Sequence, residues 1–154
     1  MSFKNIVLID FESVQPEALP GLDLPNWHLM LFVGANQLKV PLALAMAMQR
    51  MSDRAQYVQI SGQGPNALDF HIAFYLGQLA AASPDAVFHV VSKDKGFDPL
   101  IQHLQSRQIA VVRSPSLPNR TTCDATCRTS ADTEHQSSAR CAGECSRGSA
   151  RVTI

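Results

Sequence analysis

Acidic side chains follow short apolar runs of this sequence at several points. Asp10 and Glu12 come directly after the run that ends at Ile9, and Asp94 comes three residues after the run that ends at Val91. Carboxylates that are held close together repel one another unless a cation neutralises them. Oxygen ligands favour Mg²⁺ or Mn²⁺, and such an ion polarises a phosphoryl oxygen and activates a water molecule. The pattern therefore predicts metal-dependent hydrolysis of a phosphodiester, with no protein nucleophile.

Other polar side chains are expected at the same edge of the molecule. The lysines among them could meet the phosphates that flank a scissile bond. The residues that we predict to contact RNA or its phosphates are Asn36, Lys39, Ser92, Lys93 and Lys95. For each lysine, a solvated surface position is the simpler alternative.

Alternating strands and helices would have to position these side chains. Apolar runs predict strands at 5–9, 28–33, 56–60, 86–91 and 109–113, and helix-forming runs predict helices at 42–51, 67–82 and 98–106. A short helix at 15–19 is also expected. Such alternation indicates a doubly wound, mostly parallel sheet with right-handed crossovers and helices on both faces.

The order of the strands decides whether the acids meet. In such sheets, ligands bind beyond the carboxyl ends of the strands, at the point where the strand order reverses. In the order 3-2-1-4-5 the fourth strand lies beside the first, so Asp10 and Asp94 converge, and Asp69 reaches the same rim from the first turn of a helix. We therefore expect these three carboxylates to ligate the metal, with Glu12, Ser13 and Asn66 as accessory groups.

Several of these acids also have simpler structural explanations. Asp69 lies three residues after Asn66, a residue type suited to N-caps, and could stabilise the start of that helix. Asp98 precedes Pro99 and could be an N-cap itself. Asp10 could cap the short helix after it. Only the joint occurrence of acids at several strand ends favours a metal site.

Two other motifs point to different chemistry. The segment from Gly62 to Ala67 fits the G-x-G-x-x-A dinucleotide pattern. That pattern belongs to the first strand-to-helix turn of its unit, whereas this is the third, and Asp69 would face the incoming pyrophosphate. The four cysteines, with His135 between their two pairs, could bind zinc, although zinc ribbons prefer tighter pairs. An unstructured tail with free thiols is the simpler interpretation.

Composition divides the chain of 154 residues into two parts. Residues 114–154 are rich in Ser, Thr, Arg and Ala, contain no aromatic residue and carry all four cysteines. Such a segment cannot bury enough apolar surface to offset its ordering entropy. We therefore expect one folded domain at 1–113 and a disordered tail at 114–154. The formal net charge is zero, so any contact with a nucleic acid would have to be local.

Neither a signal peptide nor a membrane span is expected. The first ten residues contain only a short apolar run that soon meets a carboxylate. No stretch reaches the roughly 18 consecutive apolar residues that a span needs. We therefore expect a cytoplasmic protein without a membrane partner.

Four blocks of the sequence resemble the bacterial PIN-like domains related to the NYN nucleases. The blocks run from Ile6 to Glu12, from Val33 to Gln37, from Gly64 to His71 and from Ser92 to Leu100, and the match extends from about Lys4 to Arg113. Four ordered blocks are a more specific signal than any one of them. The resemblance implies a three-layer Rossmann-like α/β fold with sheet order 3-2-1-4-5 and a metal-dependent endoribonuclease site of acidic residues.

The resemblance also implies roles for individual acids. Asp10 takes the place of the acid after the first strand, Asp69 that of the acid on the mid-domain helix, and Asp94 that of the acid after the fourth strand. Asp98 takes the place of a fourth catalytic acid.

Two positions depart from the NYN-like pattern. Such sequences commonly have Asn where this chain has Ser13, and a second Asp where it has Gly96. Ser13 can still donate a hydrogen bond, but Gly96 cannot ligate an ion. The missing acid is either replaced by Asp98, or the site holds one metal rather than two.

These observations lead us to expect an endoribonuclease that depends on Mg²⁺ or Mn²⁺ and acts on RNA. The alternative, favoured by Gly96, is a catalytically weak PIN-like module that binds RNA or a nucleotide, in a regulatory or toxin-like role. A homo-oligomer or a cognate inhibitor protein would fit either function.

Overall fold

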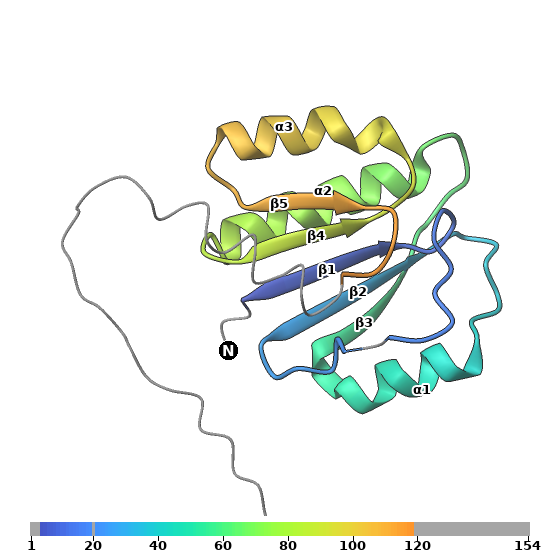
Figure 1. The fold of residues 1–154 in the computed structure, drawn as a ribbon. Helices are drawn as coiled ribbons and strands as arrows, with labels where there is room; N and C mark the ends of the chain where they lie inside the picture. The colour runs from blue at the N-terminus through green and yellow to red at the C-terminus, as the bar shows by residue number, and fades with distance from the viewer. Residues whose placement is uncertain (1–3, 20, 119–154) are drawn as a thin grey trace, which may run out of the picture.

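Five parallel strands form the centre of the fold. The computed structural model describes residues 4–19 and 21–118 (Figure 1). The strands are β1 (Asn5–Asp10), β2 (Trp27–Val33), β3 (Ala55–Gln59), β4 (Val87–Val91) and β5 (Val111–Ser114). All neighbouring pairs run parallel, in the order β3-β2-β1-β4-β5. The predicted sheet order is therefore confirmed, and the order reverses between β1 and β4.

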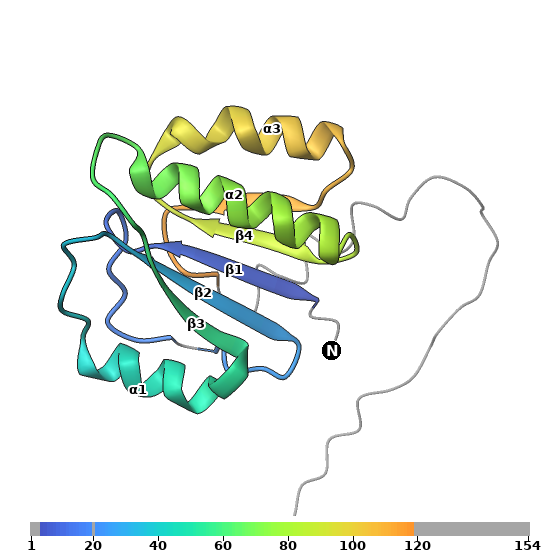
Figure 2. The ribbon, with the colours of Figure 1, turned by 180° about the vertical axis from the view of Figure 1, so that it is seen from behind.

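Helices cover both faces of the sheet and give the fold three layers. The helix α1 (Leu42–Met51) lies on one face, while α2 (Ala67–Ala82) and α3 (Asp98–Ser106) lie on the other (Figure 1, Figure 2). Short 3₁₀ turns, η1 (Ser52–Arg54) and η2 (Lys95–Phe97), precede β3 and α3. All three α-helices have the predicted bounds.

The two central strands are buried on both faces. Every residue of β2, and every residue of β1 after the first, is buried, as expected for apolar strands inside a parallel sheet. One apolar cluster lies between the sheet and the helices α2 and α3, around Ile72 and Phe88. A second cluster lies on the other face, around Leu44 and Met48 of α1. These two layers of packing hold the strand ends in place for the loops that follow them.

Two local expectations are wrong. Residues 15–19 form no helix, because so short a run makes too few helical hydrogen bonds to offset the cost of helix nucleation. Val14 and Leu19 are instead buried in the apolar cluster on the α1 side. Asn66 does not cap α2, since its backbone is left-handed with φ of 61° and its side chain makes no capping hydrogen bond. Asparagine tolerates this conformation better than most residues.

The fold continues beyond the expected boundary at residue 113. The strand β5 ends at Ser114, whose carbonyl oxygen accepts a hydrogen bond of 3.0 Å from the backbone N–H of Ser92. Leu117 packs against the cluster on the α1 side, and Pro118 is buried. The four cysteines and the rest of the expected tail lie outside the described residues. No helix in the described part of the chain is long and apolar enough to cross a membrane.

Candidate active site

The carboxylate of Asp10 is fixed at the end of the central strand β1. Its side chain is only 3% exposed. Its Oδ1 atom accepts hydrogen bonds of 3.1 Å from the backbone N–H groups of Glu12 and Ser13, and its Oδ2 atom accepts one of 2.8 Å from the hydroxyl of Ser92. Asp10 therefore caps the turn that follows β1, and it is also tied to the neighbouring strand β4.

Ser92 connects the ends of β1 and β4. Besides donating to Asp10, its Oγ atom accepts a hydrogen bond of 3.0 Å from the backbone N–H of Asp94. The Ser13 hydroxyl lies 3.3 Å from the same oxygen and accepts a hydrogen bond of 2.7 Å from the backbone N–H of Lys93. Ser92 is fully buried, so the prediction that it contacts RNA is wrong. It positions the two acids instead.

Asp94 lies beside this network, between two exposed lysines. Its Oδ1 atom accepts a hydrogen bond of 2.7 Å from the backbone N–H of Gly96. A Cβ atom at residue 96 would lie 3.2 Å from that oxygen, closer than ordinary van der Waals contact. The glycine that departs from the NYN-like pattern therefore leaves room for the Asp94 carboxylate. Lys93 and Lys95, on either side, are exposed to solvent.

Four carboxylates line one open cleft of about 270 Å³ at these strand ends. We call it the carboxylate cleft; its acidic residues are Asp10, Glu12, Asp69 and Asp94, and its wall also includes Ser13 and Asn66. Asp69 reaches the cleft from the first turn of α2. The structure thus brings the three expected metal ligands to one place, together with the three expected accessory residues.

The pKa of Asp69 reflects the crowding of negative charge in the cleft. Burial raises the pKa of this carboxyl above the ordinary aspartate value, and the charges of Asp10, Asp94 and Glu12 raise it further. A bound cation would relieve this repulsion.

The donor set of the cleft suits a hard divalent ion that keeps part of its water shell. Carboxylate oxygens are the ligands that Mg²⁺ and Mn²⁺ prefer. Within the described residues, no three side chains of His, Cys, Asp or Glu are arranged to ligate one ion together. Mg²⁺ typically takes only one or two carboxylates and retains several waters. The residues therefore fit a partly hydrated ion better than an ion enclosed by protein ligands.

Asp98 does not line the carboxylate cleft, although the family resemblance gave it the place of a fourth catalytic acid. It is the first residue of α3 and forms an ion pair with Arg113 of β5, with 2.6 Å between Oδ1 and Nε. The hydrogen bond from Arg113 lowers the pKa of Asp98 below its ordinary value. The N-cap position of α3 belongs to Phe97, so the expected capping role of Asp98 is also wrong. Asp98 instead joins α3 to β5.

Asn36 and Lys39 lie in the loop after β2 and do not line the carboxylate cleft. Asn36 lines a neighbouring cavity. Lys39 is exposed, and its carbonyl oxygen accepts a hydrogen bond of 2.7 Å from the side-chain amide of Gln37. Of the predicted RNA contacts, only Lys93 and Lys95 are therefore exposed directly beside a cleft carboxylate.

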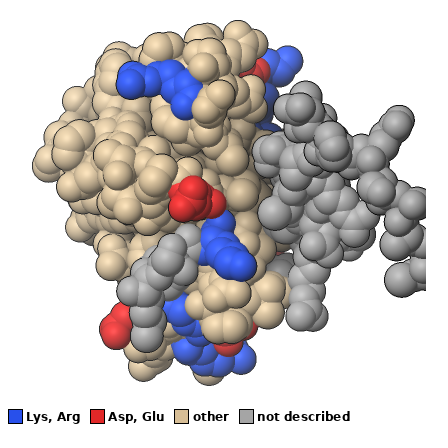
Figure 3. Space-filling view, turned by 90° about the vertical axis from the view of Figure 1, so that its left-hand side faces the viewer, with Lys and Arg blue, Asp and Glu red and all other residues tan. Residues whose placement is uncertain are grey.

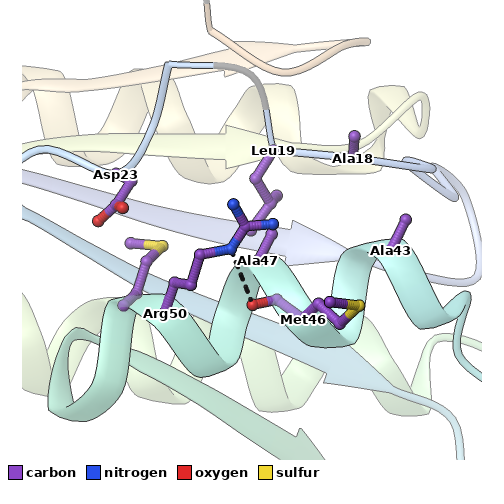
Figure 4. Close-up of a pocket in the computed structure, with 8 residues that line it drawn as sticks. Ala18, Leu19, Asp23, Ala43, Met46, Ala47 and Arg50 are labelled. Carbon is purple, nitrogen blue, oxygen red and sulfur yellow. Dashed lines mark hydrogen bonds between the residues drawn. The ribbon is translucent and has the colours of Figure 1, made fainter.

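A larger cavity of about 320 Å³ lies on the other face of the sheet, between α1 and the loop that contains Leu19 (Figure 4). Its lining is mostly apolar. Its one carboxylate, Asp23, is paired with Arg54 at 2.8 Å, and Arg50 donates a hydrogen bond to the carbonyl of Met46. This cavity offers no cluster of reactive groups.

At the side of the molecule where the strands begin, the acidic side chains in view lie apart from one another (Figure 3).

Two features of the site region escaped sequence reasoning. A Cβ atom at Gly34 would collide with the side chain of Glu12, so the absence of a side chain there lets Glu12 lie across the loop. Phe70 and Phe74 of α2 are 70% and 66% exposed. Their spacing of four residues places them on one helix face, away from the buried face that contains Leu68, Ile72 and Leu76.

Comparison with protein families agrees with this fold. The family model of the PIN domain matches residues 4–114. The closer relationship to NYN nucleases stays a prediction. Comparisons with the curated proteins and with the solved structures found no match. Because the family model covers well over half of the chain, this protein belongs to the PIN domain family.

Proposed function

We propose that this protein is an endoribonuclease that uses a divalent metal ion, Mg²⁺ or Mn²⁺, to hydrolyse RNA. The observation that carries the proposal is the carboxylate cleft at the point where the strand order reverses. PIN domains are generally nucleases and generally use divalent metal ions. Burial is the main reason that the pKa of Asp69 is raised, and the charges of Asp10, Asp94 and Glu12 raise it further; a cation would balance these charges.

The residues of the cleft have distinct tasks in this proposal. Asp10, Asp69 and Asp94 would hold the ion, directly or through its water molecules. When bound, the ion polarises a phosphoryl oxygen and makes a hydroxide-like water available. Asp10 needs little reorganisation, since three hydrogen bonds already orient its carboxylate. Ser92 and Ser13 keep the ends of β1 and β4 in register, so the distance between Asp10 and Asp94 stays constant.

Lys93 and Lys95 are the candidates for contacts with the RNA backbone. Both are exposed and flank Asp94. At this position their ammonium groups can contact the phosphates next to the scissile phosphate. Because the net charge of the whole chain is zero, it offers no broad positive field, and the charges of these two lysines would supply the attraction for RNA. We expect binding to weaken as salt concentration rises, with a shallow dependence that corresponds to few phosphate contacts.

The test is a cleavage assay on an unstructured RNA across a Mn²⁺ titration, with Asp94→Asn as the variant. Loss of one ligand charge should lower turnover by several powers of ten. In chelator the variant should be at least as stable as the parent, because one repulsive charge is gone. Asp85→Asn is the matched control, since Asp85 is exposed just before β4, away from the cleft, and should cut like the parent. Equal cleavage by Asp94→Asn at saturating Mn²⁺ would exclude Asp94 as a ligand.

A second candidate function is binding of RNA or a nucleotide without cleavage. It is favoured because no three side chains of His, Cys, Asp or Glu among the described residues are close enough to ligate one ion together, and because Gly96 supplies no carboxylate. In this case the parent would bind the RNA but would not cut it at any Mn²⁺ concentration, and Asp94→Asn would bind more tightly through reduced repulsion of phosphates.

A further inference from the structure

A second cavity of about 240 Å³ shares a wall with the carboxylate cleft. It lies between the loop after β2, the loop after β3 and the start of α2. Three residues line both spaces, namely Glu12, Ala67 and Leu68. The two spaces are therefore adjacent, so neighbouring parts of one nucleotide could occupy one each.

The lining of this cavity combines neutral amides with an apolar floor. The amides are Asn36, Gln37 and Gln63, and we call the cavity the amide pocket after them. Ile60 and Leu68, which are 5% and 3% exposed, form its apolar part. Its lining contains no lysine or arginine, and its only charged side chain is Glu12.

Hydrogen bonds brace the walls of the amide pocket against one another. The side-chain amide of Gln63 donates to the side-chain oxygen of Asn36 at 3.2 Å and so connects the two loops. Gln59 of β3 donates to the carbonyl of Ala35 at 3.2 Å. The Asn36–Gln63 bond uses one donor of the glutamine and one lone pair of the asparagine, and each amide has capacity for further bonds of both kinds.

We propose that the amide pocket binds one nucleobase of the RNA, that of the nucleotide next to the scissile phosphate. The inference rests on the proposed function. A phosphate would meet Glu12 and no cation, whereas the edge of a base offers donors and acceptors that match the two amides. The volume of the amide pocket lies below the roughly 300–1,000 Å³ of pockets for drug-sized ligands. The pocket therefore suits the ring system of one base, while the sugar and the phosphate stay in the carboxylate cleft. This pocket would give the enzyme a base preference at that position.

The first test measures binding without cleavage. The four nucleoside 5′-monophosphates, which have no internucleotide bond to cut, are titrated in the presence of Mg²⁺ against ¹⁵N-labelled full-length protein, and the side-chain amide signals of Asn36 and Gln63 are followed. At least one nucleotide should shift both signals, and ribose 5-phosphate, which has no base, should not. Gln63→Leu keeps the size of the side chain but removes its amide, and should weaken that binding about tenfold. Gln78→Ala, at an exposed glutamine of α2 outside the pocket, should bind like the parent.

The second test measures the base preference of cleavage. Short RNAs that differ in single nucleotides around the cut site are digested with the parent, Gln63→Leu and Asn36→Ala. The variants should reduce the preference at one position by about tenfold, while the metal requirement stays the same. Unchanged preference in an active enzyme, or equal shifts with ribose 5-phosphate, overturns the base pocket. If the parent cuts no RNA but its amides respond to one base, the nuclease proposal fails and the base pocket stands.

Discussion

The hydroxyl of Ser92 donates a hydrogen bond of 2.8 Å to the carboxylate of Asp10, which lies 82 residues earlier in the chain. The bond joins the ends of the two strands between which the sheet order reverses. Both groups are buried, with Ser92 fully so. The buried side chain of Ser92 therefore holds the carboxylate of Asp10 in the carboxylate cleft. Through its second hydrogen bond it also holds the backbone of Asp94.

Ser92→Ala should weaken both the fold and the site. It removes one of three hydrogen bonds to a buried carboxylate, and an unsatisfied buried acceptor typically costs about 1–3 kcal/mol. Urea unfolding in chelator measures this loss, and Mn²⁺ titration should show weaker binding. Ser106→Ala is the matched control, because the Ser106 hydroxyl is exposed and bonds only within α3. A Ser92→Ala protein with parental stability and Mn²⁺ affinity would show that the bond does not position Asp10.

Asp69→Asn should stabilise the metal-free protein, and the gain should grow with pH. Burial and the charges of Asp10, Asp94 and Glu12 raise the pKa of Asp69 in the folded state. Below its ordinary value of about 4, both folded and unfolded chains hold the proton, so repulsion by Asp69 is absent. As pH rises through the higher folded pKa, the folded protein has to carry this charge and loses stability. The asparagine variant has no such loss.

The measurement for Asp69 is thermal unfolding of both proteins in chelator at several pH values between about 3 and 8. The melting temperature of Asp69→Asn should exceed that of the parent by a growing margin as pH rises above the ordinary pKa of aspartate. Saturating Mn²⁺ should reduce or reverse the difference at neutral pH, because the ion neutralises the cleft and stabilises the parent by binding it. A difference that is constant across the pH range would mean that charge repulsion is not its cause.

Gly34→Ala should displace Glu12 while leaving the fold intact. The new Cβ atom would collide with the end of the Glu12 side chain, which is flexible and exposed and can move away. We expect the free energy of unfolding to change by less than about 1 kcal/mol, and Mn²⁺ affinity to fall because one carboxylate leaves the cleft. Gly77→Ala is the control, since nothing lies within 4 Å of its Cβ position on α2. It should stabilise the helix by about 0.5–1 kcal/mol and leave Mn²⁺ affinity unchanged.

Truncation should test whether residues 114–118 belong to the folded domain. A chain that ends at residue 118 keeps β5 and Leu117, and should unfold with the same cooperative thermal transition as the full chain. A chain that ends at residue 113 loses Ser114 from the strand and the packing of Leu117 on the α1 side, and should melt at a lower temperature. Equal melting of the two truncated chains would show that residues 114–118 add nothing to the core.

The sequence by itself determined the features that depend on local patterns. The bounds of α1, α2 and α3 follow from helix-forming runs that begin at recognisable residues, such as Pro41 before α1 and Pro99 in the first turn of α3. The two apolar runs that became β1 and β2 showed no alternation of polar residues, which is typical of strands buried on both faces. The alternation of strands and helices predicted a doubly wound parallel sheet and placed Asp10 and Asp94 after strands. The resemblance to PIN-like domains supplied the order 3-2-1-4-5 and the role of each acid, Asp69 included.

The tertiary structure decided everything that depends on partners far apart in the chain. Ser92 was predicted as a site residue because it follows β4, and Asp98 because of the family resemblance. Arg113 of the neighbouring strand pairs with Asp98, however, and the contact between β1 and β4 buries Ser92. The amide pocket exists only because the loops after β2 and β3 meet beside α2. A periodic sequence pattern indicates which face of a helix or strand is apolar. The partner of a polar side chain depends on how separate helices and strands pack together, and the local sequence does not contain that information.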